Sequence, residues 1–421
     1  MKKMFALVDA NCFYVSCERI FNPKLKNKPV IVLSNNDGCA VARSQEAKQM
    51  WVGMWEPYFK IKKKFWNDVI AQSSNYMLYG EISKRFHALA SEYTQSQEIY
   101  SIDESFLDFT CTPSPDITAR EIYHRCERDI WLPVCVWVWS TKTRAKLANH
   151  LAKKEKWFSG VCNLENIPHK QLQEIFARYD VWDLWWVWYG NALKLNELWI
   201  YSLLDLYMAD PIGVRKHTSV IMEKTIRELQ WESCLEIEEI GNKKKQIMTS
   251  RSFGKMLDSI SELSEAVTYF ATKWWEKLRQ QKSRAGSLSV SIKSNRHRED
   301  LNQYNKSYTV VFPVPTDDSM TLIKWALFAL SQIYKSGISY KKAGVRLWCL
   351  ESGSFEKMNL FWDEVSSRKK NLMSTLDSLN KRFWRGTTLF ASEWFSKTWA
   401  MNCDNRSPLY LHDWNDIPRC F

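Results

Sequence analysis

The chain has 421 residues, which is too long for one ordinary hydrophobic core, so we expect two or more domains. Its 59 basic residues outnumber its 47 acidic ones, and the net charge of +12 suits a polyanion such as nucleic acid or an acidic membrane surface. Eleven cysteines without a Cys-x-x-Cys pair, together with seven ungrouped histidines, argue against a zinc site.

The first predicted element is a short apolar strand at residues 5–8 that ends at Asp9. Because Asp9 interrupts the apolar run almost at once, the N-terminus does not resemble a signal peptide. No apolar run elsewhere in the sequence is long enough to cross a bilayer. We therefore expect a cytoplasmic protein without a membrane-spanning segment, in a reducing compartment that keeps the cysteines as thiols.

Two adjacent carboxylates, Asp103 and Glu104, lie within a second predicted strand at residues 98–108. Alternation along a strand places them on opposite faces locally, so one must reach a shared site through strand twist or side-chain length. Together with Asp9 they could hold two divalent cations, and Mg²⁺ prefers such oxygen ligands. The alternative is that these acids are merely solvated at strand ends.

The rest of the chain alternates between helical and strand-like patterns. Residues 134–139 predict a strand, and residues 142–154 predict a helix with a basic face. Residues 164–235 are mostly helical, and residues 236–249, with Lys243, Lys244 and Lys245, indicate a linker. Strand-like runs at 287–293 and 308–312 then accompany a helical run at 265–280, and residues 351–421 form a polar tail.

Motifs along the whole chain resemble the Y-family, lesion-bypass DNA polymerases. The opening Phe5-Ala-Leu-Val-Asp9-Ala-Asn-Cys-Phe-Tyr14-Val-Ser-Cys-Glu18 is similar to the start of that family. Further motifs are similar to its UmuC branch, which holds the catalytic subunit of bacterial DNA polymerase V: Leu33-Ser-Asn-Asn-Asp-Gly-Cys39, Ser73-Ser-Asn-Tyr76, Thr141-Lys-Thr-Arg-Ala-Lys-Leu-Ala-Asn149, Ser250-Arg-Ser-Phe-Gly254, Lys342-Ala-Gly-Val345 and Ser407-Pro-Leu-Tyr410. Each motif alone could arise by chance, but their common order from residue 4 to near residue 418 is highly specific.

The resemblance implies an α+β multidomain fold, the right-hand polymerase. Residues 1–14 and 76–163 would form the palm, and residues 15–75 the fingers. Residues 164–235 would form a helical thumb with a helix-hairpin-helix at 184–204. After the linker, residues 250–350 would form the α+β little finger, and residues 351–421 a C-terminal tail with partner-binding segments.

The resemblance also assigns roles to individual residues. Asp9, Asp103, Glu104 and the carbonyl of Ala10 would bind two Mg²⁺ ions beside a primer 3′-hydroxyl. Phe13 and Tyr14 would lie under the incoming sugar, with the Tyr14 ring as a gate that excludes a 2′-hydroxyl; ordinary core packing is the alternative. The triphosphate would contact Lys48, Lys146 and, with a weaker match, Arg43.

DNA and protein partners follow from the same resemblance. The hairpin at Trp186, Trp188 and Gly190 would grip phosphates through backbone amides, and Lys243, Lys244 and Lys245 would lie along the DNA. The segment Lys357, Met358, Asn359, Leu360 and Phe361 stands where a clamp-binding peptide opens with Gln, so a sliding clamp would bind it weakly. A UmuD-type dimer and a RecA filament are further implied partners.

These observations favour an error-prone, translesion DNA polymerase of SOS-type DNA repair that adds deoxynucleotides to a primer. Two alternatives stay open. One is a catalytically silent DNA-binding scaffold, against which the intact carboxylates argue. The other is a different metal-dependent nucleotidyl enzyme on a palm-like sheet, such as a cyclase, against which the predicted thumb and little finger argue.

The chain has 22 Trp and only 13 Gly, whereas a glycine share of about 7% would give about 29. Trp stands where the UmuC pattern has Gly at twelve positions: 51, 55, 131, 137, 139, 186, 188, 199, 231, 348, 384 and 394. Our hypothesis is that the source organism reads one codon as Gly that is written here as Trp. The alternative is genuine Trp enrichment in a decayed gene. Under the hypothesis, Trp at 137, 139, 186 and 188 should be turned outward or crowded against the backbone.

Overall fold

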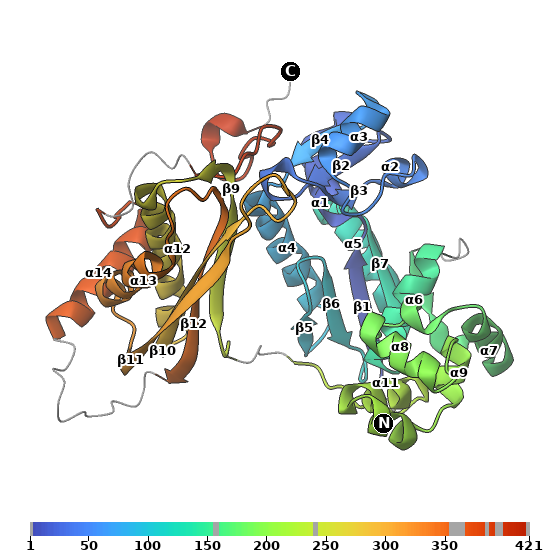
Figure 1. Ribbon diagram of the computed structural model, residues 1–421. Helices are drawn as coiled ribbons and strands as arrows, with labels where there is room; N and C mark the ends of the chain where they lie inside the picture. The colour runs from blue at the N-terminus through green and yellow to red at the C-terminus, as the bar shows by residue number, and fades with distance from the viewer. Residues whose placement is uncertain are drawn as a thin grey trace. The chain divides into compact units, whose positions relative to one another are not determined.

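The computed structural model describes residues 3–154, 160–238, 243–352, 367–383, 387–391 and 399–417. The chain divides into two compact units, whose elements are labelled in Figure 1. The first unit holds Met1–Ser34, Gly38–Gly241 and Asn405–Phe421, and the second holds Asn35–Asp37 and Asn242–Asp404. The mixture of mainly antiparallel sheets and separate helices confirms the expected α+β class.

A five-stranded sheet forms the centre of the first unit, in the order β5-β6-β1-β7-β8. Its strands are β1 (Phe5–Ala10), β5 (Gln97–Ile99), β6 (Glu104–Asp108), β7 (Val134–Trp139) and β8 (Val161–Asn163). The central strand β1 is antiparallel to both β6 and β7. The prediction of one strand over residues 98–108 was wrong, because a bend at residues 101–103 separates β5 from β6.

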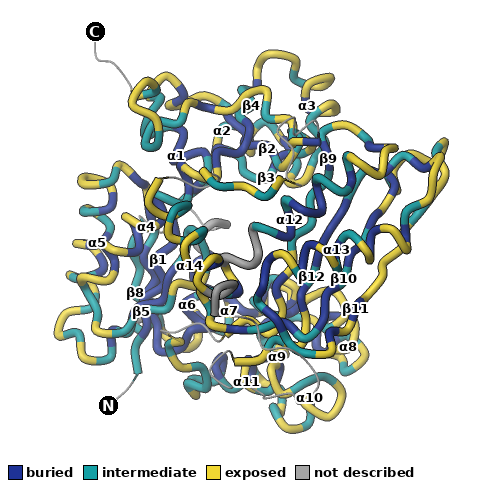
Figure 2. The backbone as a smooth tube through the Cα atoms, turned by 90° about the vertical axis from the view of Figure 1, so that its left-hand side faces the viewer, coloured by how far each residue is buried: buried dark blue, intermediate teal, exposed yellow. Residues whose placement is uncertain are grey.

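Both faces of this sheet are covered, so every residue of β1 is buried (Figure 2). Ala6 and Val8 pack with the helices α4 (Tyr76–Ser91) and α5 (Pro115–Ile130). Leu7 points the other way and packs with α6 (Lys142–Lys154) and the helices that follow it. Because side chains alternate along a strand, Asp9 shares the Leu7 face and is directed toward α6.

Two smaller groups of elements complete the first unit. One is a three-stranded sheet in the order β3-β2-β4, with these elements: α1 (Phe13–Phe21), η1 (Pro23–Leu25), β2 (Val30–Leu33), β3 (Ala40–Arg43), α2 (Gln45–Gln49), α3 (Tyr58–Phe65) and β4 (Ile70–Ser73). The other is helical, as expected for residues 164–235: η3 (Leu164–Asn166), α7 (His169–Ala177), η4 (Val181–Asp183), α8 (Tyr189–Glu197), α9 (Leu203–Met208), α10 (Pro211–His217) and α11 (Val220–Leu229).

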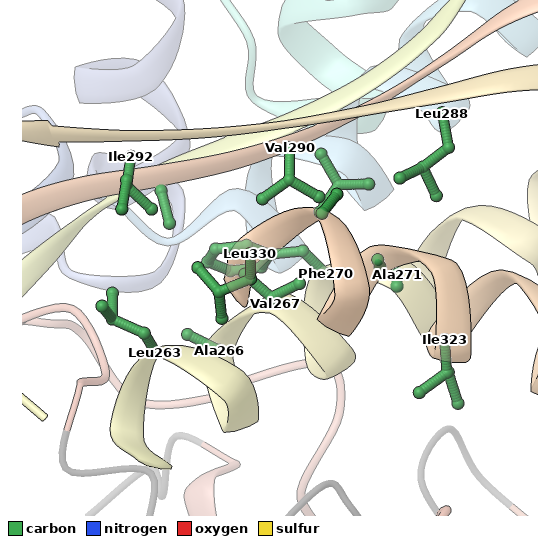
Figure 3. Close-up of a cluster of buried hydrophobic side chains, with 14 of the residues drawn as sticks. Leu263, Ala266, Val267, Phe270, Ala271, Leu288, Val290, Ile292, Ile323 and Leu330 are labelled. Carbon is green, nitrogen blue, oxygen red and sulfur yellow. The ribbon is translucent and has the colours of Figure 1, made fainter. Parts of the chain in front are cut away.

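The second unit is a four-stranded antiparallel sheet in the order β11-β10-β12-β9, with two long helices against one face. Apolar side chains such as Val267 and Phe270 of the helices meet Val290 and Ile292 of the sheet (Figure 3). Its elements are η2 (Asn35–Asp37), β9 (Ile247–Leu257), α12 (Ile260–Gln280), β10 (Ser283–Ser294), β11 (Asn305–Thr316), α13 (Ser319–Ile333), β12 (Tyr340–Ser352) and α14 (Ser367–Arg382). The α14 helix is fixed by an ion pair between Arg279 and Asp377.

The last described residues return to the first unit, where η5 (Trp414–Asp416) lies near the end of the chain. Across the described ranges, no helix combines the length and apolar character that a membrane span requires.

Tryptophan occupies an unusual share of left-handed backbone positions. Of the thirteen described non-glycine residues with positive φ, seven are Trp: residues 51, 55, 66, 131, 186, 199 and 231. Positive φ is uncommon for bulky residues and costs little only for glycine. Six of the seven belong to the twelve positions where the UmuC pattern has Gly. The seventh, Trp66, is not one of those twelve positions. This geometry supports the hypothesis that a glycine codon is written here as Trp.

The four tryptophans expected to be turned outward or crowded against the backbone differ in placement, and Trp186 is half-buried with φ 73°. Trp188 is 72% exposed, whereas the side chains of Trp137 and Trp139 on β7 are buried in the core cluster that includes residues of α6. The reason is the position of β7 inside the sheet, where every side chain of the α6 face enters the core. Trp384 and Trp394 lie outside the described residues.

Replacing Trp131 with Gly should raise the free energy of unfolding by about 1 kcal/mol. Trp131 ends α5 with φ 60° and ψ 28°, and its ring is 63% exposed, so the substitution relieves backbone strain and loses little packing. Trp185 in the same unit is the matched control, because it packs on Tyr100 and Phe106 and has no positive φ. Trp185→Gly should cost about 2 kcal/mol in urea titrations.

A loss of stability in Trp131→Gly would contradict this account of the backbone. The origin of the residue is tested separately by the gene. The ordinary Trp codon at all twelve positions named above would exclude codon reassignment.

Candidate active site

Three carboxylates meet where the strand β1 ends and the antiparallel strand β6 begins. Strand register places Asp9 directly opposite Glu104. The amide of Ala10 donates to the carbonyl of Asp103 at 2.8 Å, which fixes the bend before β6 against the end of β1. Asp9 is 3% exposed, and the other two side chains are largely buried. The arrangement brings together the three acids that the sequence singled out.

Each carboxylate has a polar neighbour. The Asn149 Nδ2 donates to Asp9 Oδ2 at 2.7 Å, and the Lys146 ammonium pairs with Glu104. Both neighbours lie on α6, three residues apart, and therefore on one helix face. The Ser101 hydroxyl donates to Asp103 Oδ1 at 2.5 Å.

Burial and mutual repulsion raise the pKa of two of these acids. Desolvation raises the pKa of Asp103, and the negative charge of Asp9 adds to it. Desolvation is also the main cause that raises the pKa of Glu104 to about 7, with Asp9 adding and Lys146 opposing. Carboxylates crowded in this way are stabilised by added positive charge.

The donor set fits divalent cations, because buried carboxylate oxygens beside a backbone carbonyl are the ligands that Mg²⁺ prefers. Within the described ranges, however, no three acidic, His or Cys side chains are already spaced as a closed metal cage. Glu104 is engaged with Lys146 instead.

Phe13 and Tyr14 begin α1, directly after the left-handed turn at Cys12. Phe13 is buried in the core, as the packing alternative predicts. Tyr14 is only partly buried, and its ring stacks on Tyr79 with centroids 4.5 Å apart. Burial raises the pKa of Tyr14, and nearby Tyr76 and Asp103 add to it. Tyr14 thus packs against Tyr76 and Tyr79 and is influenced by the charge of Asp103, whereas Phe13 is part of the core.

The three predicted phosphate-binding residues differ in their placement. Lys146 lies at the carboxylates, and Lys48 reaches Cys12 with its Nζ 3.4 Å from the sulfur. Arg43 instead donates to the carbonyl of Val52 at 2.6 Å. Lys48 and Lys146 are therefore near the site, while Arg43 supports its own loop.

The predicted DNA-binding residues form two groups, which are exposed except for the half-buried Trp186. Trp186 has φ 73°, Trp188 caps the N-terminus of α8, and Gly190 lies exposed in its first turn. Asn191 donates to the carbonyl of Trp186 at 3.3 Å and closes this turn. Lys243, Lys244 and Lys245 are exposed before β9 in the second unit. The segment Lys357, Met358, Asn359, Leu360 and Phe361 lies outside the described residues.

Sequence reasoning missed several side chains around the site. Asn149 stood within a quoted motif, and its spacing from Lys146 on a predicted helix was the available signal. Tyr79, which stacks on Tyr14, and Glu18, which accepts the Tyr79 hydroxyl bond at 2.6 Å, gave no comparable signal.

Comparison with solved structures identifies the class of the fold. A Y-family DNA polymerase chimera of Dbh and Dpo4 matches with a TM-score of 0.66 and 20% identity, over 83% of this chain and 99% of that chain. An insertion ternary complex of Dbh DNA polymerase matches with a TM-score of 0.54 and 20% identity, over 82% of this chain and 98% of that one. The fold is that of the Y-family DNA polymerases.

Sequence relatives identify the branch. Residues 8–150 match the impB/mucB/samB family, residues 244–360 its C-terminal domain, and residues 370–420 a domain of unknown function. The protein UmuC of Salmonella typhimurium is 40% identical over 99% of this chain and all of the relative. MucB of Escherichia coli is 37% identical over 99% of both chains. The chain belongs to the UmuC family of Y-family DNA polymerases.

Replacing Asn149 with Ala should lower the rate of nucleotide addition by about 10- to 100-fold, because Asp9 loses the amide that orients it. Single-turnover primer extension across a Mg²⁺ titration measures the effect. Asn415→Ala is the matched control, since that amide also donates to an aspartate, Asp413 Oδ1 at 3.1 Å, but on the exposed surface of the same unit. Equal rates in both variants would show that Asn149 does not orient Asp9.

Proposed function

We propose that the protein is a template-directed, error-prone translesion DNA polymerase that adds deoxynucleotides to a primer 3′-hydroxyl. The observation that carries this is the convergence of Asp9, Asp103 and Glu104 at the end of β1 and β6. Family membership supports the polymerase class, and the SOS-type repair role comes from the resemblance to UmuC.

The carboxylates would hold two Mg²⁺ ions, which when bound supply charge neutralisation to an attacking hydroxyl and a leaving pyrophosphate. Asp9, Asp103 and the Ala10 carbonyl would be ligands of these ions. Asn149 orients the Asp9 carboxylate. Glu104 would exchange its Lys146 partner when the site fills, because a divalent cation attracts a carboxylate more strongly than one ammonium does.

The substrate would contact residues on either side of these acids. Lys146, released from Glu104, and Lys48 would hold the triphosphate, and Arg43 would contribute through its loop. Tyr14 would stand under the sugar, where its ring leaves no room for a 2′-hydroxyl, and Phe13 would support it. Such catalysis depends mostly on positioning and charge neutralisation.

We assign the sheets to the parts of a right hand. The five-stranded sheet would be the palm, the three-stranded sheet the fingers, the cluster α7–α11 the thumb, and the second unit the little finger, followed by the tail. The turn at Trp186, Trp188 and Gly190 would meet DNA phosphates, and so would Lys243, Lys244 and Lys245. The net charge of +12 supports binding that weakens as salt rises.

Accessory partners belong to the proposal. A UmuD-type dimer, a RecA filament and a weakly bound sliding clamp at Lys357–Phe361 would be recruited in the bacterial cytoplasm. A silent DNA-binding scaffold and a cyclase-like enzyme remain the rival functions, and templated primer extension separates all three.

Replacing Asp103 with Asn should lower incorporation by about a thousandfold, because a lost carboxylate charge weakens the neutralisation on which the chemistry depends. DNA binding, measured by fluorescence anisotropy, should stay within the range of the parent protein. Asp129→Asn is the matched control, as Asp129 lies on the exposed side of α5 with Arg125 and Arg128. Full extension by Asp103→Asn in Mg²⁺ would refute the assignment.

Replacing Tyr14 with Ala should reduce the preference for deoxynucleotides over ribonucleotides by about 100-fold, since the ring no longer excludes the 2′-hydroxyl. The ratio of kcat/KM for dATP and ATP opposite a templated T measures this preference. Tyr14→Phe keeps the ring and should keep the ratio. An unchanged ratio in Tyr14→Ala would show that another group reads the sugar.

A further inference from the structure

The C-terminal segment Asn405–Tyr410 packs on the first unit between the three-stranded sheet and α1, far along the chain from both. The amide of Ser73, at the end of the edge strand β4, donates to the carbonyl of Asn405 at 2.9 Å. The Asn405 amide returns a bond to the Ser73 hydroxyl at 2.9 Å. Tyr410 stacks on Phe21 at the end of α1, with centroids 4.9 Å apart and 9° between the planes.

Buried polar groups fix the middle of this segment. Asn75 is 2% exposed, and its Nδ2 donates to the Ser407 hydroxyl at 3.0 Å and to the carbonyl of Pro408 at 3.2 Å. Ser407 is itself buried, and a hydrogen bond from its side chain is among the causes that lower the pKa of the Glu18 carboxyl. The segment Asn405–Tyr410 is therefore held by specific hydrogen bonds as well as by the stacking of Tyr410.

Glu18 connects the segment to the interior. Its side chain is 1% exposed and accepts the Tyr79 hydroxyl at 2.6 Å. Desolvation raises the pKa of Glu18, and the bonds from Tyr79 and Ser407 oppose that rise. A buried carboxylate that loses such a donor moves or takes up a proton, because its unpaired oxygen costs free energy.

Tyr79 connects Glu18 to the sugar gate, Tyr14. The Tyr79 side chain is fully buried, and its ring lies 18° from the plane of Tyr14 with centroids 4.5 Å apart. Any shift of Tyr79 is therefore transmitted to the face of Tyr14. A cavity of about 300 Å³ borders Glu18 and Ser407, so Glu18 has space to move once its bond to Ser407 is lost.

We propose that the C-terminal segment Asn405–Tyr410 positions the sugar gate, with Ser407 acting on Tyr14 through Glu18 and Tyr79. Ser407, Glu18 and Tyr79 are positioning residues, since none of them is placed at the reacting atoms. The proposal rests on the role proposed above for Tyr14. The proposal gives a role to part of residues 370–420, which match a domain of unknown function.

The test measures the ratio of kcat/KM for dATP and ATP in the full-length chain. Ser407→Ala and Tyr79→Phe should each lower this ratio at least about fivefold. Ser407→Thr keeps the hydroxyl and should restore it. Tyr93→Phe is the matched control, because it also removes a tyrosine bond to a glutamate, Glu121 at 3.0 Å, but on the exposed surface.

A purely structural role for Ser407 predicts a different result. It would lower the thermal midpoint of Ser407→Ala while leaving the sugar ratio unchanged, and that outcome would overturn the proposal. In the double variant of Tyr14→Ala and Ser407→Ala, the second change should have no further effect on the ratio. An additive effect would mean that Ser407 acts by another route.

The same series separates this proposal from the gate itself. If Tyr14→Ala leaves the ratio unchanged, the gate assignment fails and this proposal fails with it. If Tyr14→Ala abolishes the preference and Ser407→Ala does not alter it, only the positioning role fails.

Discussion

The register between β1 and β6 is the constraint on which the site depends. It sets Asp9 opposite Glu104, and the amide of Ala10 then fixes the bend that carries Asp103. A shift of one residue would turn Asp9 toward α4 and α5 and leave Lys146 and Asn149 without acidic partners. Two covered faces make such a shift costly, because every side chain of β1 is buried. The burial of β1 in the sheet therefore offsets the repulsion among the three carboxylates.

The sequence alone was enough to predict the class, the strand that ends at Asp9 and the three acids, because these lie in short contiguous motifs. It misplaced the start of β6, since the bend at residues 101–103 depends on the Ser101 hydroxyl and on contacts with β1. It also missed Glu18 and Ser407, which lie nearly four hundred residues apart in the chain. Periodicity carries no information about such long-range polar pairs. The roles given to site residues remain predictions of the resemblance.

Glycine positions show where backbone and side chain give different information. A helix that ends in a left-handed residue needs a C-cap without a Cβ, and the chain keeps that backbone at Trp131 although the side chain is bulky. At β7 the backbone tolerates any residue, so Trp137 and Trp139 enter the core and are detected only as unusual volume. Backbone angles therefore mark some positions where glycine would be favoured, while strand positions need a comparison with relatives.

The return of the chain to the first unit has a consequence for its synthesis. A ribosome makes the N-terminal residues first, and domains generally fold as they emerge. The pocket around Glu18 nevertheless lacks Ser407 until translation has passed all three carboxylates and reached residue 407. A nascent or prematurely terminated polypeptide would thus carry all three carboxylates but an unsupported Tyr14. If Ser407 positions Tyr14 as proposed, synthesis of Asn405–Tyr410 is required for sugar selection, long after the catalytic carboxylates have been made.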